Sequence, residues 1–413
     1  MKDKLVKILK DQFYPISLYS RQIAGTLVLF LIAHYLSVYE YGLFTSYKSI
    51  ATFCLMFANL GFNEYIVVSA QNIVKNAQLK IAFFVLNAIF LTILIAFGSE
   101  FANFETRLLF ILVLIRQFFD GTFFALVLPY FQASKKFNII SSVNIFYSVV
   151  MVAIAVSAYI FKLSLVKFLI LNIALGVINF VQVSFYAKIN YALGVKHYKD
   201  LFGKIDKSIF SYMSVTICYY LYSQIQGLFV ATYTPKEEAA LYFAAFTIAT
   251  IIGLLLTAQV QKMVPEMIKA NVDKINNIIK KELIFIMGIN TLVFLFFVFF
   301  GKWLLLLLYG QEYYLKAYPL LLILTISNIS IALAAIYGAY ITASGNQHLK
   351  IRMQIEAIFI AIISLAILHK LGIYAATISY FLSATHIGIR YVIKTKQLLR
   401  LDNIKENVCK SKN

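Results

Sequence analysis

Long runs of apolar residues follow one another along the chain, separated only by short polar segments. A helix needs roughly 20 apolar residues to cross the hydrocarbon core of a bilayer. By this measure the sequence predicts an all-α integral membrane protein with twelve transmembrane helices. The predicted spans cover residues 16–38, 43–68, 79–99, 107–132, 139–161, 165–188, 207–232, 240–264, 282–308, 318–342, 350–369 and 372–394.

The composition agrees with this pattern, since 61% of the residues are hydrophobic and only 13% are charged. An ordinary soluble domain is about 45–50% apolar and about 25% charged. The formal net charge is +19, which in a soluble protein would suggest a nucleic-acid partner. Here the basic residues fall between the apolar runs, so we expect them to set the membrane topology, and we expect no nucleic-acid partner.

The basic residues are distributed unequally over the two predicted faces. If both termini lie on one side, that side carries 26 Lys and Arg residues and the opposite side carries seven. Cytoplasmic loops hold the excess of Lys and Arg in membrane proteins, so both termini are predicted to be cytoplasmic. Residues 1–14 are predicted to form an amphipathic helix on the membrane surface, and residues 397–413 a basic cytoplasmic tail.

Several kinds of catalytic and metal site are not indicated by the sequence. Cys54, Cys218 and Cys409 lack the spacing of a disulfide framework or a metal site, and the five histidines are scattered. No GxxxxGK[ST] phosphate-binding motif is present. The loops are short, so no external loop offers the cluster of polar groups that a membrane enzyme would need. We therefore expect no enzymatic activity and no cofactor.

A weak internal repeat relates the two halves of the chain. EYGLFTSYKSIAT at 40–52 and EAALYFAAFTIAT at 238–250 share Glu, Leu and a closing Ile-Ala-Thr. These segments open the second and the eighth predicted span, one in each half of six helices. Internal repeats are common in transporters, and the substrate site lies between the repeats. We predict two six-helix lobes, residues 15–200 and 201–396, around a central cavity.

Four segments resemble, in their order and spacing, segments of the polysaccharide exporters. They are AHYLSVYEYGLFTSYKSIATFCLMFANLGFNEYI at 33–66, LLYGQEYYLKAYPLLLIL at 307–324, YITASGNQHLK at 340–350 and HKLGIYAATISYFLS at 369–383. The chain is similar to the Wzx-type O-antigen and capsule flippases of the multidrug/oligosaccharidyl-lipid/polysaccharide (MOP) superfamily.

This resemblance implies a substrate, a location and partners. Such flippases move a polyprenyl-pyrophosphate-linked oligosaccharide from the cytoplasmic to the outer leaflet of the bacterial inner membrane. We therefore expect alternating access between two lobes, with the lipid tail remaining among membrane lipids. The resemblance also implies a polysaccharide polymerase and a chain-length regulator as protein partners.

Charged residues inside the predicted spans are the main candidates for a substrate site. Arg116 and Asp120 lie one helical turn apart in VLIRQFFDGTFF, and Arg21 and Lys48 lie about five residues inside the first and second spans. A charge at the centre of a spanning helix costs about 2.5–3.5 kcal/mol and faces the protein interior or water. The three cations would bind the pyrophosphate, with Asp120 holding Arg116 or carrying a coupling proton. The alternatives are a structural Arg116–Asp120 ion pair and, for Arg21 and Lys48, contact with lipid headgroups.

Two glutamines are candidates for sugar contacts. Gln224 and Gln226 lie among tyrosines in the seventh span. Their amides would bind sugar hydroxyls in the cavity between the lobes. The alternative is a hydrogen bond between helices of the protein.

Two glutamates are candidates for coupling transport to H⁺ or Na⁺. Glu64 lies at the cytoplasmic end of the second span, and Glu356 lies in the eleventh. The alternative is pairing with nearby basic residues, which for Glu356 include Arg352 four positions earlier. Arg390, close to the end of the twelfth span, is predicted to reach the lipid headgroups.

Two other transport functions are open on this sequence. A drug or metabolite exporter of the same superfamily would take cationic cargo in exchange for H⁺ or Na⁺ and would need buried carboxylates. The three cations within the spans outnumber Asp120 and Glu356, which favours anionic cargo. A lipid II flippase shares the pyrophosphate chemistry, but such flippases usually carry two further helices.

Overall fold

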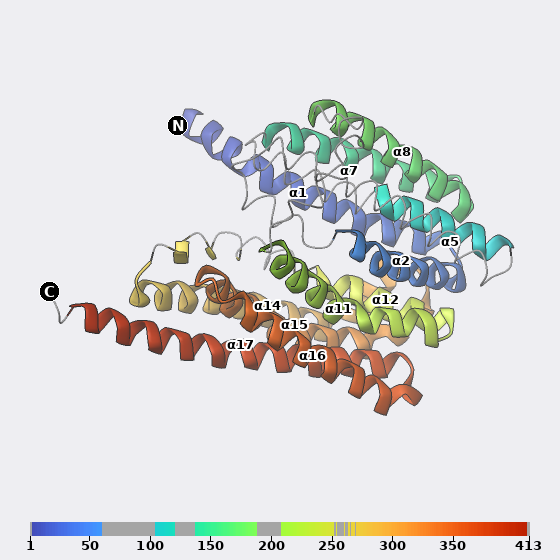
Figure 1. Cartoon of the computed structure of the whole chain (residues 1–413). Helices are drawn as coiled ribbons and strands as arrows, with labels where there is room; N and C mark the ends of the chain where they lie inside the picture. The colour runs from blue at the N-terminus through green and yellow to red at the C-terminus, as the bar shows by residue number, and fades with distance from the viewer. Residues whose placement is uncertain are drawn as a thin grey trace, which may run out of the picture. The chain divides into compact units, whose positions relative to one another are not determined.

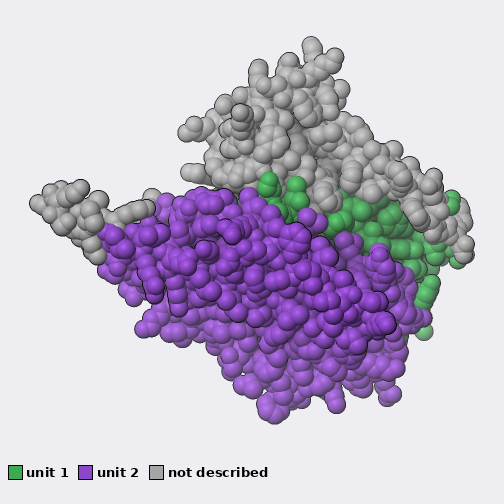
Figure 2. Space-filling model, turned by 60° about the horizontal axis from the view of Figure 1, so that its bottom comes forward, with its two compact units in different colours: residues 1–220 green, residues 221–413 purple. Residues whose placement is uncertain are grey.

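The computed structural model describes residues 2–59, 104–119, 137–187, 208–251 and 270–410, together with a few positions between 252 and 269. All elements of this described part are helices (Figure 1). The chain divides into two compact units, residues 1–220 and 221–413 (Figure 2). One helix, α11 (Ser208–Tyr233), runs across this division.

The described part of unit 1 is a bundle of long apolar helices. Helix α1 packs along α7, α2 packs along α5, and α8 contacts both α5 and α7. The core of this bundle contains apolar side chains that are fully buried, such as Ile32, Phe44 and Leu114. The helices are α1 (Lys2–Tyr35), α2 (Val38–Asn59), α5 (Phe104–Gln117), α7 (Phe137–Ile160) and α8 (Leu165–Ala187).

Unit 2 is built around α15, which packs against α12, α14, α16 and α17 (Figure 1). Helix α14 begins with Asn271 as N-cap, whose side chain accepts a hydrogen bond from the backbone N–H of Lys274, and it ends at Gly310 with φ of 69°. The elements are α12 (Lys236–Thr250), α14 (Val272–Tyr309), η3 (Glu312–Ala317), α15 (Tyr318–Ala343), α16 (Gln347–Leu368), η4 (His369–Leu371) and α17 (Ile373–Lys410).

The described helices fall on eleven of the twelve predicted spans, and the third span, 79–99, lies outside the described residues. Helix α1 runs without a break through the segment expected on the membrane surface, and α17 continues through most of the expected tail. Within the described part, five helices are long and apolar enough to cross a membrane by length and composition. The predicted lobe boundary at 200/201 and the cytoplasmic termini stay predictions.

Apolar side chains also cover the outward faces of the helices. Phe185 on α8, Phe299 on α14 and Ile367 on α16 are among the large hydrophobic residues exposed on the surface. A soluble monomer rarely exposes large contiguous apolar patches. Lipid tails solvate such faces without cost, so the structure confirms the expected all-α membrane protein.

Helices α15 and α17 approach each other closely where Gly388 faces the backbone of Ser330. Small residues allow such approaches between membrane helices. A Cβ atom on Gly388 would lie 2.7 Å from the carbonyl oxygen of Ser330. We therefore expect Gly388→Ala to lower the free energy of unfolding by about 1–3 kcal/mol, the usual cost of overpacking.

Thermal unfolding in detergent, followed by circular dichroism, measures this effect. Gly288→Ala on α14 is the matched control, because a Cβ atom there meets nothing within 4 Å. The control is expected to keep or slightly raise the midpoint temperature of unfolding, since alanine has a higher helix propensity than glycine. If Gly388→Ala unfolds at the wild-type midpoint temperature, α15 and α17 do not approach each other this closely at Gly388.

Candidate functional site

Arg116 is a buried cation near the end of the described part of α5. It lies twelve residues after Phe104, about 18 Å along the helix at 1.5 Å per residue. Only 5% of its surface is exposed, and its guanidinium carbon lies 5.7 Å from the centroid of the Phe44 ring on α2. An arginine over an aromatic face gains a cation–π attraction. The structure therefore places this charge inside unit 1, between α2 and α5.

Lys48 lies one helical turn after Phe44 on α2 and is half-buried. Residues four apart share one face of a helix. The face of α2 that receives Arg116 therefore also carries Lys48. Two of the three predicted cations thus belong to the same helix pair.

Arg21 occupies a different helix pair, α1 and α7. Its guanidinium carbon lies 4.2 Å from the centroid of the Tyr147 ring, and the side chain is half-buried. Polar groups lie beside this contact. Ser20 precedes Arg21 and Ser148 follows Tyr147, and their two hydroxyls lie 3.4 Å apart. Asn144, one turn before Ser148, is fully buried, and neither polar atom of its amide has a hydrogen-bond partner among the described residues.

The candidates Asp120 and Glu64 lie outside the described residues. The structural alternative for Arg116, an ion pair with Asp120, therefore stays a prediction. The same holds for a coupling role of Glu64.

Gln226 takes part in an interhelical hydrogen bond in unit 2. The side chain is fully buried, and Nε2 donates to Oγ of Ser383 on α17 at 3.3 Å. This is the structural alternative that the sequence left open. Within the described residues, its buried Oε1 atom has no hydrogen-bond partner. Gln224, two positions earlier on α11, is half-buried.

Glu356 is the centre of a charged cluster between α16 and α17. Arg390 donates from Nε to Oε2 at 2.7 Å and from Nη2 to Oε1 at 2.9 Å. His386 Nε2 lies 3.3 Å from Oε2, and Arg352 Nε lies 3.4 Å from Oε1. The side chains of Glu356, His386 and Arg390 are each 28% exposed, whereas Arg352 is 73% exposed. Both oxygens of the carboxylate are thus engaged by a bidentate arginine.

This cluster corrects the expectation for Arg390. Its guanidinium forms an ion pair with Glu356 of the neighbouring helix. Contrary to the prediction from the sequence, it is therefore not directed at lipid headgroups. The sequence held a signal, since His386 and Arg390 stand four apart on one helix face, as Arg352 and Glu356 do on another. The signal was missed because the sequence does not show which helix faces meet.

Structures of known transporters share the fold of this chain. The eukaryotic MATE transporter AtDTX14 superposes with a TM-score of 0.60 at 12% identity, covering 97% of this chain and 99% of that one. A MOP superfamily transporter from Pyrococcus furiosus gives a TM-score of 0.62 at 15% identity, with 95% of each chain covered. The Vibrio cholerae MATE transporter VcmN, in its bent form, gives 0.54 at 14% identity, covering 97% of this chain and 98% of that one.

These likenesses concern the fold, because the identities are low. No curated protein matches the chain. A family of proteins described as polysaccharide biosynthesis proteins matches residues 31–319, which is most of the chain. The chain therefore belongs to the polysaccharide biosynthesis protein family and is a membrane protein with the fold of the MOP superfamily transporters.

Proposed function

We propose that this protein is a flippase that moves a polyprenyl-pyrophosphate-linked oligosaccharide across the membrane by alternating access. The observation that carries the proposal is the burial of Arg116 at 5% exposure in a protein of the polysaccharide biosynthesis family. A charged residue within a spanning helix is costly, and it marks a place that faces the protein interior or a substrate path. A pyrophosphate supplies such an anion, and the planar guanidinium suits its oxygens.

In this proposal the pyrophosphate passes along the cations of the N-terminal half. It pairs first with Arg21, near the buried amide of Asn144, whose two polar atoms have no hydrogen-bond partner in the part of the chain that the structure describes. It then pairs with Arg116 and is released near Lys48, on the opposite side. Asp120 restrains Arg116 when no substrate is bound, and Gln224 contacts the sugars, while Gln226 keeps its hydrogen bond to Ser383.

The proposed setting follows from the resemblance to flippases. The protein acts in the bacterial inner membrane with both termini in the cytoplasm. A polysaccharide polymerase and a chain-length regulator take over the product. Coupling to H⁺ or Na⁺ would use Asp120, Glu64 or Glu356, and for Glu356 the bidentate contact with Arg390 would have to open during the cycle.

An exporter of the same superfamily is the second candidate function. For the MOP superfamily transporter from Pyrococcus furiosus, the reverse polarity of the binding pocket suggests a different function. Cationic cargo would require buried carboxylates facing the pocket. In the part of unit 1 that the structure describes, the buried charged group is Arg116.

Proteoliposomes distinguish the two functions. Wild-type protein is reconstituted with a fluorescent polyprenyl-pyrophosphate oligosaccharide, and a membrane-impermeant quencher reports how much has changed leaflet. A parallel set of vesicles is loaded with a cationic dye and given an H⁺ or Na⁺ gradient. Flipping without dye transport supports the proposal, and gradient-driven dye transport without flipping establishes the exporter. A lipid II probe in a third set tests the lipid II flippase.

A further inference from the structure

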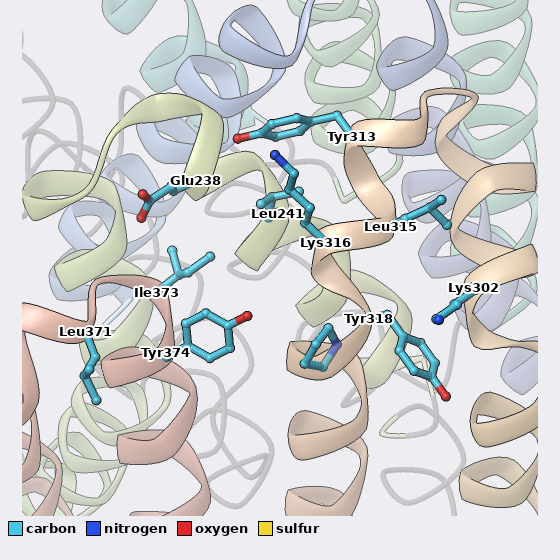
Figure 3. A pocket seen from close by; sticks show the side chains of 11 residues that line it. Glu238, Leu241, Lys302, Tyr313, Leu315, Lys316, Tyr318, Leu371, Ile373 and Tyr374 are labelled. Carbon is cyan, nitrogen blue, oxygen red and sulfur yellow. The ribbon is translucent and has the colours of Figure 1, made fainter.

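A pocket of about 620 Å³ opens at the end of unit 2 where α14 ends and α12, α15 and α17 begin (Figure 3). Its volume lies within the range of about 300–1,000 Å³ that is typical of small-molecule sites. This end of the unit is the one that the distribution of basic residues predicts to face the outside. A ligand here would therefore be on the outer side of the membrane.

The wall formed by η3 is held rigidly. Tyr309 and Tyr314 are fully buried and stack with ring centroids 4.6 Å apart. The hydroxyl of Tyr309 donates to the carbonyl oxygen of Ala244 on α12 at 3.0 Å. Gly310 between them has φ of 69°, a conformation that glycine adopts without strain. These contacts fix η3 against α12 and α14, so the pocket is preformed.

Two lysines present their ammonium groups beside tyrosine rings in the pocket (Figure 3). Lys316 Nζ lies 4.6 Å from the ring centroid of Tyr313, and Lys302 Nζ lies 5.4 Å from that of Tyr318. Neither ammonium forms an ion pair or a hydrogen bond with the residues that the structure describes. Their N–H donors are therefore available to an anion, while the tyrosine rings restrain the two side chains.

The rest of the lining adds an acceptor and an apolar surface. Glu238 stands at the start of α12, next to Gly372, where an added Cβ atom would lie 3.1 Å from the carboxylate oxygen Oε2. Tyr374 at the start of α17 is 41% exposed. The carboxylate accepts hydrogen bonds from hydroxyl groups, and an exposed tyrosine offers a rigid apolar face with few rotatable bonds.

We propose that this pocket binds a carboxylate-bearing sugar of the oligosaccharide on the outer side of the membrane. Lys316 pairs with the sugar carboxylate, and Lys302, beside Tyr318, adds a second positive charge to the lining. Glu238 accepts from the hydroxyls, and the ring of Tyr374 packs against the apolar face of the sugar. A phospholipid phosphate could pair with the same lysines, but it offers no ring hydroxyls to Glu238 and no sugar face to Tyr374. The inference rests on the proposed function, which supplies an oligosaccharide as the ligand.

Equilibrium binding of a simple sugar acid tests the assignment. The full chain is placed in nanodiscs of phosphatidylcholine, and saturation-transfer NMR compares glucuronate with glucose. Glucuronate is expected to bind more tightly than glucose. An exposed ion pair contributes up to about 1 kcal/mol, or about fivefold in affinity, so Lys302→Gln/Lys316→Gln is expected to weaken glucuronate binding by about fivefold or more. Lys370→Gln is the control, because this exposed lysine on η4 does not line the pocket.

Several results would overturn the assignment. They are equal binding of glucose and glucuronate, no binding of glucuronate, or an unchanged affinity in the double variant. Loss of glucuronate binding in nanodiscs containing phosphatidylglycerol would make the pocket a lipid-headgroup site.

The measurement needs no transport, so it is separate from the proposed function. A wild type that flips its substrate but does not bind glucuronate refutes the pocket alone, and one that binds glucuronate but flips nothing refutes the flippase alone.

Discussion

Replacing Arg116 with alanine is expected to reduce the flipping rate of a polyprenyl-pyrophosphate oligosaccharide by about tenfold to a hundredfold. A hydrogen bond to a charged group contributes about 1.5–3 kcal/mol, and 1.4 kcal/mol corresponds to a factor of ten. The flipping rate falls because the pyrophosphate loses its hydration when it enters the protein, and in the variant no guanidinium at position 116 replaces the lost water. Arg116→Lys is expected to restore part of the rate, since lysine keeps the charge but not the planar fork.

The proteoliposome assay measures this rate for each variant, normalised to the protein inserted. Arg400→Ala on the exposed face of α17 is the matched control and is expected to flip at the wild-type rate. Thermal unfolding in detergent separates a structural effect from a functional one. A variant Arg116→Ala with full flipping and a lower midpoint would show that Arg116 serves the packing of α2 and α5, and that the substrate binds elsewhere.

Replacing Arg390 with alanine is expected to lower the free energy of unfolding by about 2–3 kcal/mol, because two hydrogen bonds to the charged Glu356 are lost. Both bonds are short, at 2.7 and 2.9 Å, and both side chains are 28% exposed. Glu356→Ala is expected to cost at least as much, since it leaves Arg390 and His386 facing each other without an anion. The double variant Glu356→Ala/Arg390→Ala is expected to lose less than the sum of the two single effects.

Thermal unfolding in detergent measures the four proteins of this cycle. Arg352→Ala is the control, because its side chain is 73% exposed and an exposed pair within one helix contributes about 0.3–0.5 kcal/mol. Additive losses in the double variant would mean that Glu356 and Arg390 do not interact. If Glu356→Gln keeps the wild-type midpoint but makes flipping independent of an ion gradient, Glu356 serves coupling and not packing.

The positions of the spanning helices could be predicted because lipid leaves the backbone few choices. Each buried N–H and C=O group must be satisfied within its own helix, so a sufficiently long apolar run becomes a spanning helix. The boundaries of α8 and α15 fall within one residue of the predicted spans 165–188 and 318–342. The start of α14 and the end of α17 did not follow, because each helix includes charged turns outside its apolar part.

The candidate site was predictable only in part. A charge within an apolar run marks a residue that must face protein or water, which is why Arg116 could be selected before its burial was known. The identity of its neighbour could not be predicted, since Phe44 lies on another helix. Lys302 and Lys316 could not be selected as site residues from the sequence, because lysines near helix ends are common in membrane proteins. Only the fold of η3 places both in the lining of one pocket.

The sequence by itself determined the order and type of the helices that the structure describes, and the family, because these depend on apolar length and on local motifs. Only the tertiary structure decided which polar side chains meet. Glu356 and Arg390 are 34 residues apart, and Gln226 and Ser383 are 157 apart. Their contacts depend on the rotation of each helix about its axis. Packing against neighbouring helices sets that rotation, and the apolar length of a helix does not.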